Sequence, residues 1–168
     1  TAHEPALTPV APEKSGPRLF VWSRDQRHLY LLNELDAALR VMAYDKERGT
    51  LRPLQRTTTL PAGFTGEPWA AYIHLSPDGR TLYFVSDRGG APQIYTVPAS
   101  GGQPRRVTFQ GSYNISPAIS PDGRYMAYIS QVDAGYRLHL MELATGKVTP
   151  LTDHRDDESP SFAPNSKL

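Results

Sequence analysis

The sequence of 168 residues contains no cysteine, so neither disulfide bonds nor thiolate chemistry can contribute to its fold or function. No apolar run approaches the ~20 residues that a helix needs to cross a bilayer, and we therefore predict no membrane insertion. Basic and acidic residues nearly balance, at 18 and 17. Without an excess of positive charge, the chain gives no reason to expect nucleic acid as a partner.

Turn-forming residues are abundant by contrast, with 16 prolines and 13 glycines. They separate short runs of aromatic and β-branched residues, a pattern that predicts an all-β chain. Four of the prolines fall within residues 1–17, where no apolar periodicity occurs. We interpret this segment as a flexible Pro-rich tail. It lacks the charged start and apolar core of an intact signal peptide.

One turn motif recurs after this tail. Its copies begin at Ser23, Ser76, Ser120 and Ala163, and the second and third read Ser-Pro-Asp-Gly-Arg. Their spacings are 53, 44 and 43 residues, and the first is longer because a Gly/Pro-rich loop is inserted at 60–68. In such a turn, proline fixes φ, aspartate accepts local backbone hydrogen bonds and glycine supplies a positive φ. Each copy is therefore predicted to join two strands as a hairpin.

Periods in the low forties are typical of the blades of a β-propeller, each of which is a sheet of four antiparallel strands. We therefore predict a partial β-propeller with three four-stranded antiparallel blades and the first strand of a fourth. The blades are assigned to residues 18–63, 69–111 and 114–154, and the partial blade to residues 158–168, with its strand at 159–162.

The second strand expected in each blade is apolar along nearly its whole length, at 28–33, 81–86 and 125–130. A strand with one wet face would alternate apolar and polar residues. Both faces of these strands should therefore be buried, as they are between neighbouring blades. A flat β-sandwich is the competing fold, and it explains the period of about 43 residues less well.

Four stretches of the first half carry a resemblance to a known family. They are His-Leu-Tyr at 28–30, Asn-Glu-Leu-Asp at 33–36, Thr-Leu-Pro-Ala-Gly-Phe-Thr-Gly-Glu at 59–67 and Ala-Ala-Tyr-Ile-His-Leu-Ser-Pro-Asp-Gly at 70–79. Through them, residues from about 28 to 85 resemble the lactonase-type propellers, the family of 6-phosphogluconolactonase. The resemblance implies a site in the central channel in which His74 acts as acid or base, with Glu67 and Arg88 as its neighbours.

Two positions depart from the pattern of that family. Tyr72 stands where an acidic residue is expected, and Asp87 stands where asparagine is expected before arginine. A family active site also draws on blades beyond these three. We therefore predict no catalytic activity. Lactone hydrolysis by His74, Glu67 and Arg88 is kept as the alternative.

The second half carries a different resemblance, through residues 86–95, 106–114, 151–153 and 157–165. Residues from about 82 to 168 resemble TolB, the periplasmic propeller of the Tol–Pal system. The resemblance implies a periplasmic location and a rim at the channel mouth that receives the lipoprotein Pal. Most charged runs like the one at 153–158 are solvated loops, and the rim is its functional interpretation. The rim residues are Tyr113, Asn114, Asp156, Asp157 and Glu158.

The two resemblances meet at residues 76–88, inside a hairpin that both families need. We interpret the chain as an engineered or recombined chimera, with a natural divergent propeller fragment as the alternative. It has no Gly-x-Ser-x-Gly elbow, no phosphate-binding glycine loop and no His-Glu-x-x-His pair. Its five histidines lack the spacing of metal ligands. We therefore predict a non-catalytic scaffold with TolB-like protein binding, without cofactor or metal.

Three blades would leave two open blade faces. Each would expose on the order of 500 Å² of apolar surface, which is more than a stable monomer usually exposes in one patch. We therefore predict a homo-oligomer, and a dimer first of all. Two copies arranged head to tail would form a ring of six blades with two-fold symmetry, in which the strand at 159–162 is exchanged or displaced.

Overall fold

The computed structural model describes residues 11–133, 135–153 and 156–166. These residues form twelve β-strands in three four-stranded antiparallel sheets, and no helix. Consequently, the described part of the chain contains no helix that is long and apolar enough to cross a membrane. The predicted all-β fold, with three four-stranded blades of a partial propeller, is confirmed.

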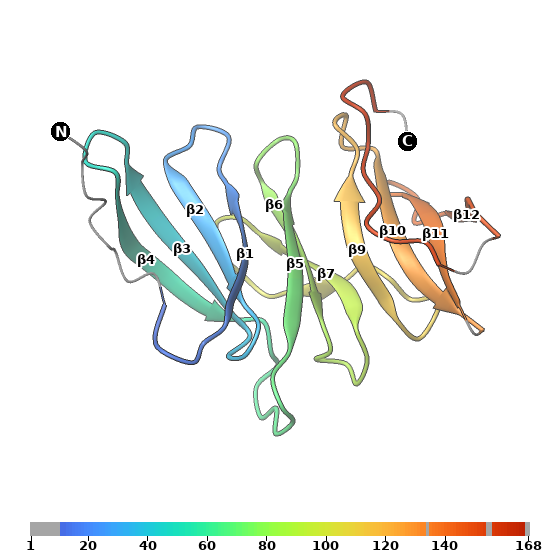
Figure 1. Ribbon diagram of the computed structural model, residues 1–168, viewed down its shortest axis with the longest axis horizontal. Coiled ribbons are helices and arrows are strands. Elements are labelled where there is room, and N and C mark those ends of the chain that lie inside the picture. Colours follow the sequence, from blue (N-terminus) through green and yellow to red (C-terminus); the bar gives the residue numbers. More distant parts are fainter. Residues whose placement is uncertain (1–10, 134, 154–155, 167–168) are drawn as a thin grey trace.

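Each blade is a meander in which consecutive strands pair (Figure 1). Blade 1 contains β1 (Pro17–Trp22), β2 (His28–Asn33), β3 (Ala38–Asp45) and β4 (Thr50–Thr58). Blade 2 contains β5 (Ala70–Leu75), β6 (Thr81–Ser86), β7 (Gln93–Pro98) and β8 (Arg105–Arg106). Blade 3 contains β9 (Asn114–Ile119), β10 (Tyr125–Val132), β11 (Gly135–Glu142) and β12 (Val148–Pro150).

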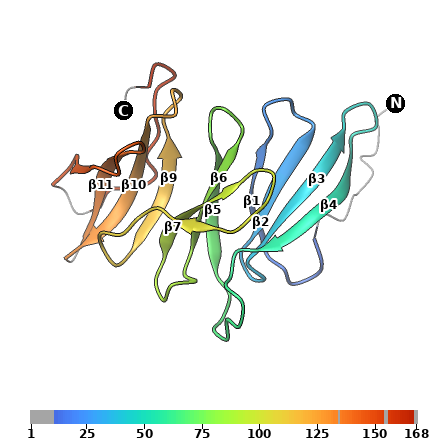
Figure 2. The same cartoon turned by 180° about the vertical axis from the view of Figure 1, so that it is seen from behind.

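The first strand of each blade is the innermost one. β1 packs against β5, and β5 packs against β9, so the three inner strands are neighbours. Further contacts between the blades come from β2 against β5 and from β6 and β7 against β9. Figure 2 shows the same row of sheets from behind, with blade 2 between the other two.

Alternate residues of each second strand face opposite neighbours. One apolar cluster joins blade 1 to blade 2, and a second joins blade 2 to blade 3. The first contains Tyr30, Leu32, Leu82 and Phe84. The second contains Tyr83, Val85, Met126 and Tyr128. The expected burial of both faces of the second strand is therefore confirmed for β6, which contributes to both clusters.

The repeated turns share one hydrogen-bond pattern. In each, the serine hydroxyl donates to the aspartate Oδ1 at 2.6 Å and accepts the backbone N–H of the first residue of the next strand at 2.9 Å. The hydrogen bond from serine is the main cause that holds the pKa of each aspartate below 3.8. The three serine and aspartate pairs are Ser23 and Asp25, Ser76 and Asp78, and Ser120 and Asp122.

The fourth copy of the turn is also folded. The backbone N–H of Ser166 donates to the carbonyl of Ala163 at 2.9 Å, as that of Gly123 does to Ser120 at 2.8 Å. The Ser166 hydroxyl accepts the N–H of Asp122 at 3.1 Å, which joins this turn to blade 3. Residues 159–162 precede the turn at the position of the next inner strand, and they pair with no strand among the described residues.

The segment before β1 lies partly within the described residues. Of the tail that we predicted at 1–17, residues 1–10 lie outside them. The hydroxyl of Ser15 donates to the carbonyl of Pro12 at 2.6 Å. The backbone carbonyls of Ser15 and Gly16 accept the N–H groups of Leu35 and Glu34 at 3.2 and 2.7 Å. Residues 11–16 are thus held against the loop after β2, and Pro17 begins β1.

We expect the contact between blades 1 and 2 to be a main source of stability. Phe84 is 1 % exposed, and its ring stacks on that of Tyr95 at 5.9 Å between centroids. Phe84→Ala should lower the free energy of unfolding by about 3–5 kcal/mol in urea denaturation, because it leaves a cavity. Phe109→Ala, at a site 74 % exposed, should cost no more than about 0.5 kcal/mol. Equal losses in the two variants would contradict this account of the core.

Candidate functional site

Polar side chains gather at the edge of the blades opposite the Ser-Pro-Asp-Gly turns. We call this the loop edge; it is formed by residues 34–37, 59–69, 87–92 and 110–113, which connect the strands there. The turns lie at the top in Figure 1 and the loop edge at the bottom. Loops that a rigid sheet holds in place are common positions for binding and catalytic residues.

Glu34 joins blade 1 to blade 2 at this edge. Its Oε1 lies 2.6 Å from Nη1 of Arg18, which is in β1. The same oxygen accepts the indole N–H of Trp69 at 3.1 Å. Trp69 directly precedes β5, so one carboxylate fixes the starts of two neighbouring inner strands.

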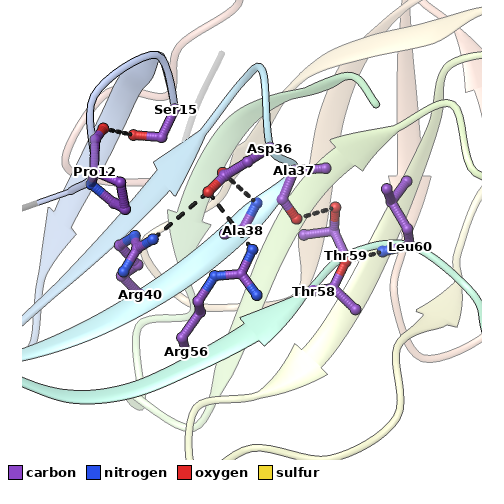
Figure 3. A network of polar contacts seen from close by, with 10 residues as sticks. All are labelled: Pro12, Ser15, Asp36, Ala37, Ala38, Arg40, Arg56, Thr58, Thr59 and Leu60. Atoms are coloured by element: carbon purple, nitrogen blue, oxygen red, sulfur yellow. Dashed lines mark hydrogen bonds and ion pairs between the residues drawn. The ribbon is translucent and has the colours of Figure 1, made fainter. Parts of the chain in front are cut away.

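A polar network holds the loop that follows Glu34 (Figure 3). Asp36 lies 3.6 Å from both Arg40 and Arg56, and it accepts the backbone N–H of Ala38 at 3.0 Å. The hydroxyl of Thr59 donates to the carbonyl of Ala37 at 2.9 Å. The network ties the loop after β2 to β3 and to the end of β4, and it keeps Glu34 in place.

Asp87 and Arg88 follow β6 and lie at the same edge. The Arg88 guanidinium lies 5.4 Å above the ring of Tyr95, and burial lowers its pKa. Burial raises the pKa of Asp87, and this effect exceeds the opposite effect of the backbone amides of Asp87 and Trp69. Within the described part of the chain, Asp87 Oδ1 and Arg88 Nη1 are buried and have no hydrogen-bond partner. Buried polar atoms of this kind often mark a site that binds a ligand.

A cavity of about 440 Å³ opens between the inner strands of blade 3 and residues 156–159, and Tyr72 of β5 adds to its lining from blade 2. Tyr113 connects the loop edge to this cavity: its ring centroid lies 6.0 Å from that of Tyr136, a cavity residue. Burial raises the pKa of Tyr113. The nearby Tyr136 and Tyr72 raise this pKa further, whereas Arg18 lowers it. The cavity is lined by Tyr72, Ile115, Ser116, Ile129, Tyr136, Asp156, Asp157, Glu158 and Ser159.

Three cavity residues have a left-handed backbone. Tyr72, Ser116 and Ser159 have φ of 53°, 52° and 44°, and they occupy the same position in successive repeats. In blades 2 and 3 this position coincides with an irregularity in the pairing of the inner strand. A non-glycine residue with positive φ is strained, and such strain often occurs at functional sites. All three residues with this backbone conformation line the same cavity.

The structure places the five predicted rim residues in different surroundings. Asp156, Asp157 and Glu158 line the cavity. The Asp157 carboxylate also accepts hydrogen bonds from the N–H of Leu138 at 3.1 Å and from the hydroxyl of Thr152. It thereby joins its own segment to β11 and to the residues that follow β12. Asn114 has no exposed surface, and its amide donates to Gln93 and Gln110 at 2.8 Å each. Tyr113 is half-buried beside Tyr136. The predicted rim is therefore in part a surface and in part a structural network.

The three residues of the predicted alternative site come from three different segments. Glu67 is exposed in the loop before β5, and Arg88 follows β6 at the same edge. His74 pairs with Tyr83 and shares its side of the sheet, which faces blade 3. It lies four residues beyond Ala70, or about 13 Å along the strand from the loop edge. Burial lowers the pKa of His74 and so favours the neutral imidazole.

Sequence reasoning missed the cluster of Arg18, Glu34, Trp69 and Asp87. Each of these residues stands within two positions of a strand end, at the same edge of neighbouring blades. Their shared position next to the ends of strands was the signal in the sequence that could have revealed the cluster. In the described residues, no group of three or more histidine, aspartate or glutamate side chains is arranged to hold a metal ion.

The fold and the loop edge define a propeller with a polar site at the mouth of its channel. The model of the TolB beta propeller domain matches residues 22–168, and the chain belongs to this family. The chain is also 24 % identical to the TolB structure from Acinetobacter baumannii, with a TM-score of 0.54 over 94 % of this chain and 48 % of that one. That likeness concerns the fold.

Other relatives are named as lactonases. The 6-phosphogluconolactonase of Sodalis glossinidius is 28 % identical over 93 % of this chain and 50 % of its own length. The structure of the periplasmic gluconolactonase of Pseudomonas aeruginosa is 34 % identical, with a TM-score of 0.62, over 89 % of this chain and 42 % of that one. The chain thus spans about half the length of the curated relatives it matches.

These relatives correct two predictions. The prediction of a non-catalytic scaffold is wrong, because relatives along most of the chain carry the names of lactone-hydrolysing enzymes. Both family resemblances are supported, but neither stops at residues 76–88: the TolB model begins at residue 22, and the lactonase match covers 93 % of the chain.

The pKa of His74 predicts a specific pH dependence of stability. Burial lowers this pKa below 6.5, so the folded protein binds the proton less readily than the unfolded chain does. The resulting stabilisation is present above pH 6.5 and is lost as the pH falls toward the folded pKa.

His74→Gln should therefore lose less thermal stability than the parent protein between about pH 7.5 and pH 5. Thermal unfolding followed by circular dichroism would measure the difference. His28→Gln, at the start of β2, is the matched control. The same pH dependence in the parent and in His74→Gln would contradict the burial of His74.

Proposed function

We propose that this chain forms part of a lactonase-type hydrolase site at the loop edge of the propeller channel. The observation that carries the proposal is the 34 % identity to the periplasmic gluconolactonase of Pseudomonas aeruginosa, over 89 % of this chain. The buried, unpartnered atoms of Asp87 and Arg88 supply the physical support. The substrate class is a sugar lactone, following the names of the relatives.

Lactone hydrolysis requires a base and a group that stabilises negative charge. Water adds to the carbonyl carbon, the ring C–O bond breaks, and the product is a hydroxy acid. Asp87 suits the role of base, because burial raises its pKa above the ordinary value of a carboxyl group and its Oδ1 is free to accept a proton from water. The unpartnered Nη1 of Arg88 suits the oxyanion that develops on the carbonyl oxygen.

His74 has a smaller part in this proposal. Its neutral imidazole could accept a proton, as the family resemblance implies, but it lies about 13 Å along β5 from the loop edge. We assign it a packing role between blades 2 and 3. Glu67 is exposed in the adjacent loop and remains a candidate for contact with the substrate.

We also propose a periplasmic location. Its support is that the Pseudomonas aeruginosa neighbour is named as a periplasmic enzyme and that the chain belongs to the TolB propeller family. A lipoprotein partner at the rim stays a prediction. Fractionation of cells that express the natural protein would test the location, and its recovery from the cytoplasm would contradict it.

Substitutions at Asp87 and Arg88 should separate chemistry from folding. In a lactone-hydrolysis assay, Asp87→Asn should reduce kcat by about 10²- to 10⁴-fold, since it removes the base. Arg88→Lys should reduce kcat by about 10²-fold, since it removes the planar donor. Gluconolactone and its 6-phosphate are the two substrates to compare.

The matched control is Arg80→Lys, the same change in an exposed arginine at the opposite edge of the blade, and it should keep full activity. Circular dichroism would verify that all variants are folded. Unchanged turnover in Asp87→Asn and Arg88→Lys would remove the two residues from the mechanism. A folded parent protein without turnover of either lactone would overturn the proposal.

A further inference from the structure

We propose that Glu34 is a positioning residue for the lactonase-type site: it holds the side chain of Trp69, and Trp69 in turn holds the Asp87 carboxylate. The catalytic consequence rests on the proposed function. The connection from blade 1 to Asp87 rests on contacts among the described residues.

Trp69 and Asp87 lie opposite each other just beyond one strand pair. Ala70, the first residue of β5, pairs with Ser86, the last residue of β6. Because the two strands are antiparallel, the residue before Ala70 faces the residue after Ser86. Burial raises the pKa of Asp87, and the backbone amides of Asp87 and Trp69 donate to the carboxylate and counteract this rise. A displacement of Trp69 therefore changes the surroundings of the Asp87 carboxylate directly.

The side chain of Trp69 is held by the neighbouring blade. Its indole N–H donates to Oε1 of Glu34 at 3.1 Å, across the boundary between blades 1 and 2. An indole has this single donor, so Glu34 restrains the orientation of the ring. The backbone N–H of Glu34 donates to the carbonyl of Gly16 at 2.7 Å, which fixes Glu34 in its turn. The orientation of Trp69 is thus set from blade 1.

Arg18 holds the carboxylate of Glu34 and extends the connection to blade 3. Its Nη1 lies 2.6 Å from Oε1 of Glu34. Burial raises the pKa of Tyr113 and the Arg18 guanidinium lowers it, so Arg18 also lies near this residue, which directly precedes β9. Glu34 and Arg18 together interact with residues at the starts of blades 2 and 3. A carboxylate in this position can transmit a change in blade packing to the site.

The backbone that carries Asp87 and Arg88 is fixed by its own turn. The N–H of Gly90 donates to the carbonyl of Asp87 at 2.7 Å, and the N–H of Arg88 donates to the hydroxyl of Ser86 at 3.2 Å. The Arg88 guanidinium stacks on Tyr95. The Asp87 side chain has less support, because its Oδ1 has no hydrogen-bond partner within the described part of the chain. Its environment therefore depends on where the amide of Trp69 lies.

The loss of Glu34 should change the protonation of the base. A hydrogen bond to the charged form of a carboxyl group lowers its pKa, and the loss of that bond raises it. Without Glu34, the amide of Trp69 is no longer held at Asp87, and the pKa of Asp87 rises further above its ordinary value. A base must be unprotonated to accept a proton from water, so the acid limb of the pH dependence of kcat moves to higher pH.

The test is the titration of the Asp87 carboxyl group by NMR, in the full chain with isotope-labelled aspartate. The signal that disappears in Asp87→Asn assigns it. Glu34→Ala and Trp69→Phe should each raise the pKa of Asp87, and the double variant should raise it no further, because both residues act along one path. Glu34→Gln keeps an oxygen for the indole N–H and should restore the parent pKa. The matched control is Glu47→Ala, an exposed glutamate in the turn after β3, which should titrate as the parent does.

Hydrolysis of gluconolactone gives the second measurement. Glu34→Ala should lower kcat by about 10- to 100-fold with KM nearly unchanged, because the base is displaced while the contacts to the substrate remain. The acid limb of kcat should shift in the same direction as the pKa from NMR. Circular dichroism would verify that each variant is folded.

The two measurements separate this proposal from the lactonase assignment. An Asp87 pKa that is the same in folded Glu34→Ala as in the parent would overturn the positioning role, whatever the turnover. So would a pKa that rises in Glu34→Ala but not in Trp69→Phe, or one that Glu34→Gln fails to restore. A parent that hydrolyses neither lactone would overturn the proposed function, and the NMR titration would still decide whether Glu34 acts on Asp87.

Discussion

Each blade of this molecule has an apolar side chain on both faces of its second strand, and the rest of the structure follows from this constraint. A sheet that is apolar on both faces cannot be covered by water on either side. β6 satisfies the requirement within the chain, because Leu82 and Phe84 meet blade 1 while Tyr83 and Val85 meet blade 3. The same apolar pattern continues on the outer faces of blades 1 and 3, which contact no further blade among the described residues.

A second, polar arrangement connects blade 2 to the inner strand of blade 3, and blade 3 to the segment after β12. In blade 2, the Thr108 hydroxyl accepts the N–H of Ile94 at 3.0 Å and donates to Gln93 at 2.7 Å, and Gln93 accepts the amide of Asn114 at 2.8 Å. This chain of bonds runs from the outer strand to the first residue of the next inner strand.

Blade 3 repeats the arrangement with different residues. Thr152 accepts the N–H of Leu138 at 3.0 Å, and its hydroxyl donates to Asp157, which stands where Asn114 stands one repeat earlier. A backbone hydrogen bond is repeated as well. The N–H of Asp157 donates to the carbonyl of Tyr136 at 3.2 Å, as the N–H of Asn114 donates to that of Pro92 at 2.9 Å. The third blade is thereby already joined to the segment that begins the next repeat.

The periodic part of the structure was predictable from the sequence, and the site was not. The turns at Ser23, Ser76 and Ser120 fixed the blade count, because their geometry is local and depends on few residues. Of the predicted rim residues, Asp156 and Glu158 line the cavity, and their part in binding a protein stays a prediction. The cluster of Glu34, Trp69 and Asp87 depends on which strand ends meet across blades, and sequence distance does not reveal this. The side of β5 on which His74 lies could not be read from simple alternation, because the pairing of β5 is irregular at Tyr72.

The two edges of the propeller therefore have different roles. The turns at Ser23, Ser76 and Ser120 form the same hydrogen bonds, so the turn edge of the three blades does not distinguish one blade from another. The loop edge differs in each repeat: an insertion precedes β5, a charged pair follows β6 and an acidic segment follows β12. A ligand at the channel mouth would contact a different chemistry from each blade. Such asymmetry is what a repeated scaffold needs to bind one substrate in one orientation, and it supports the proposal of a site at this edge.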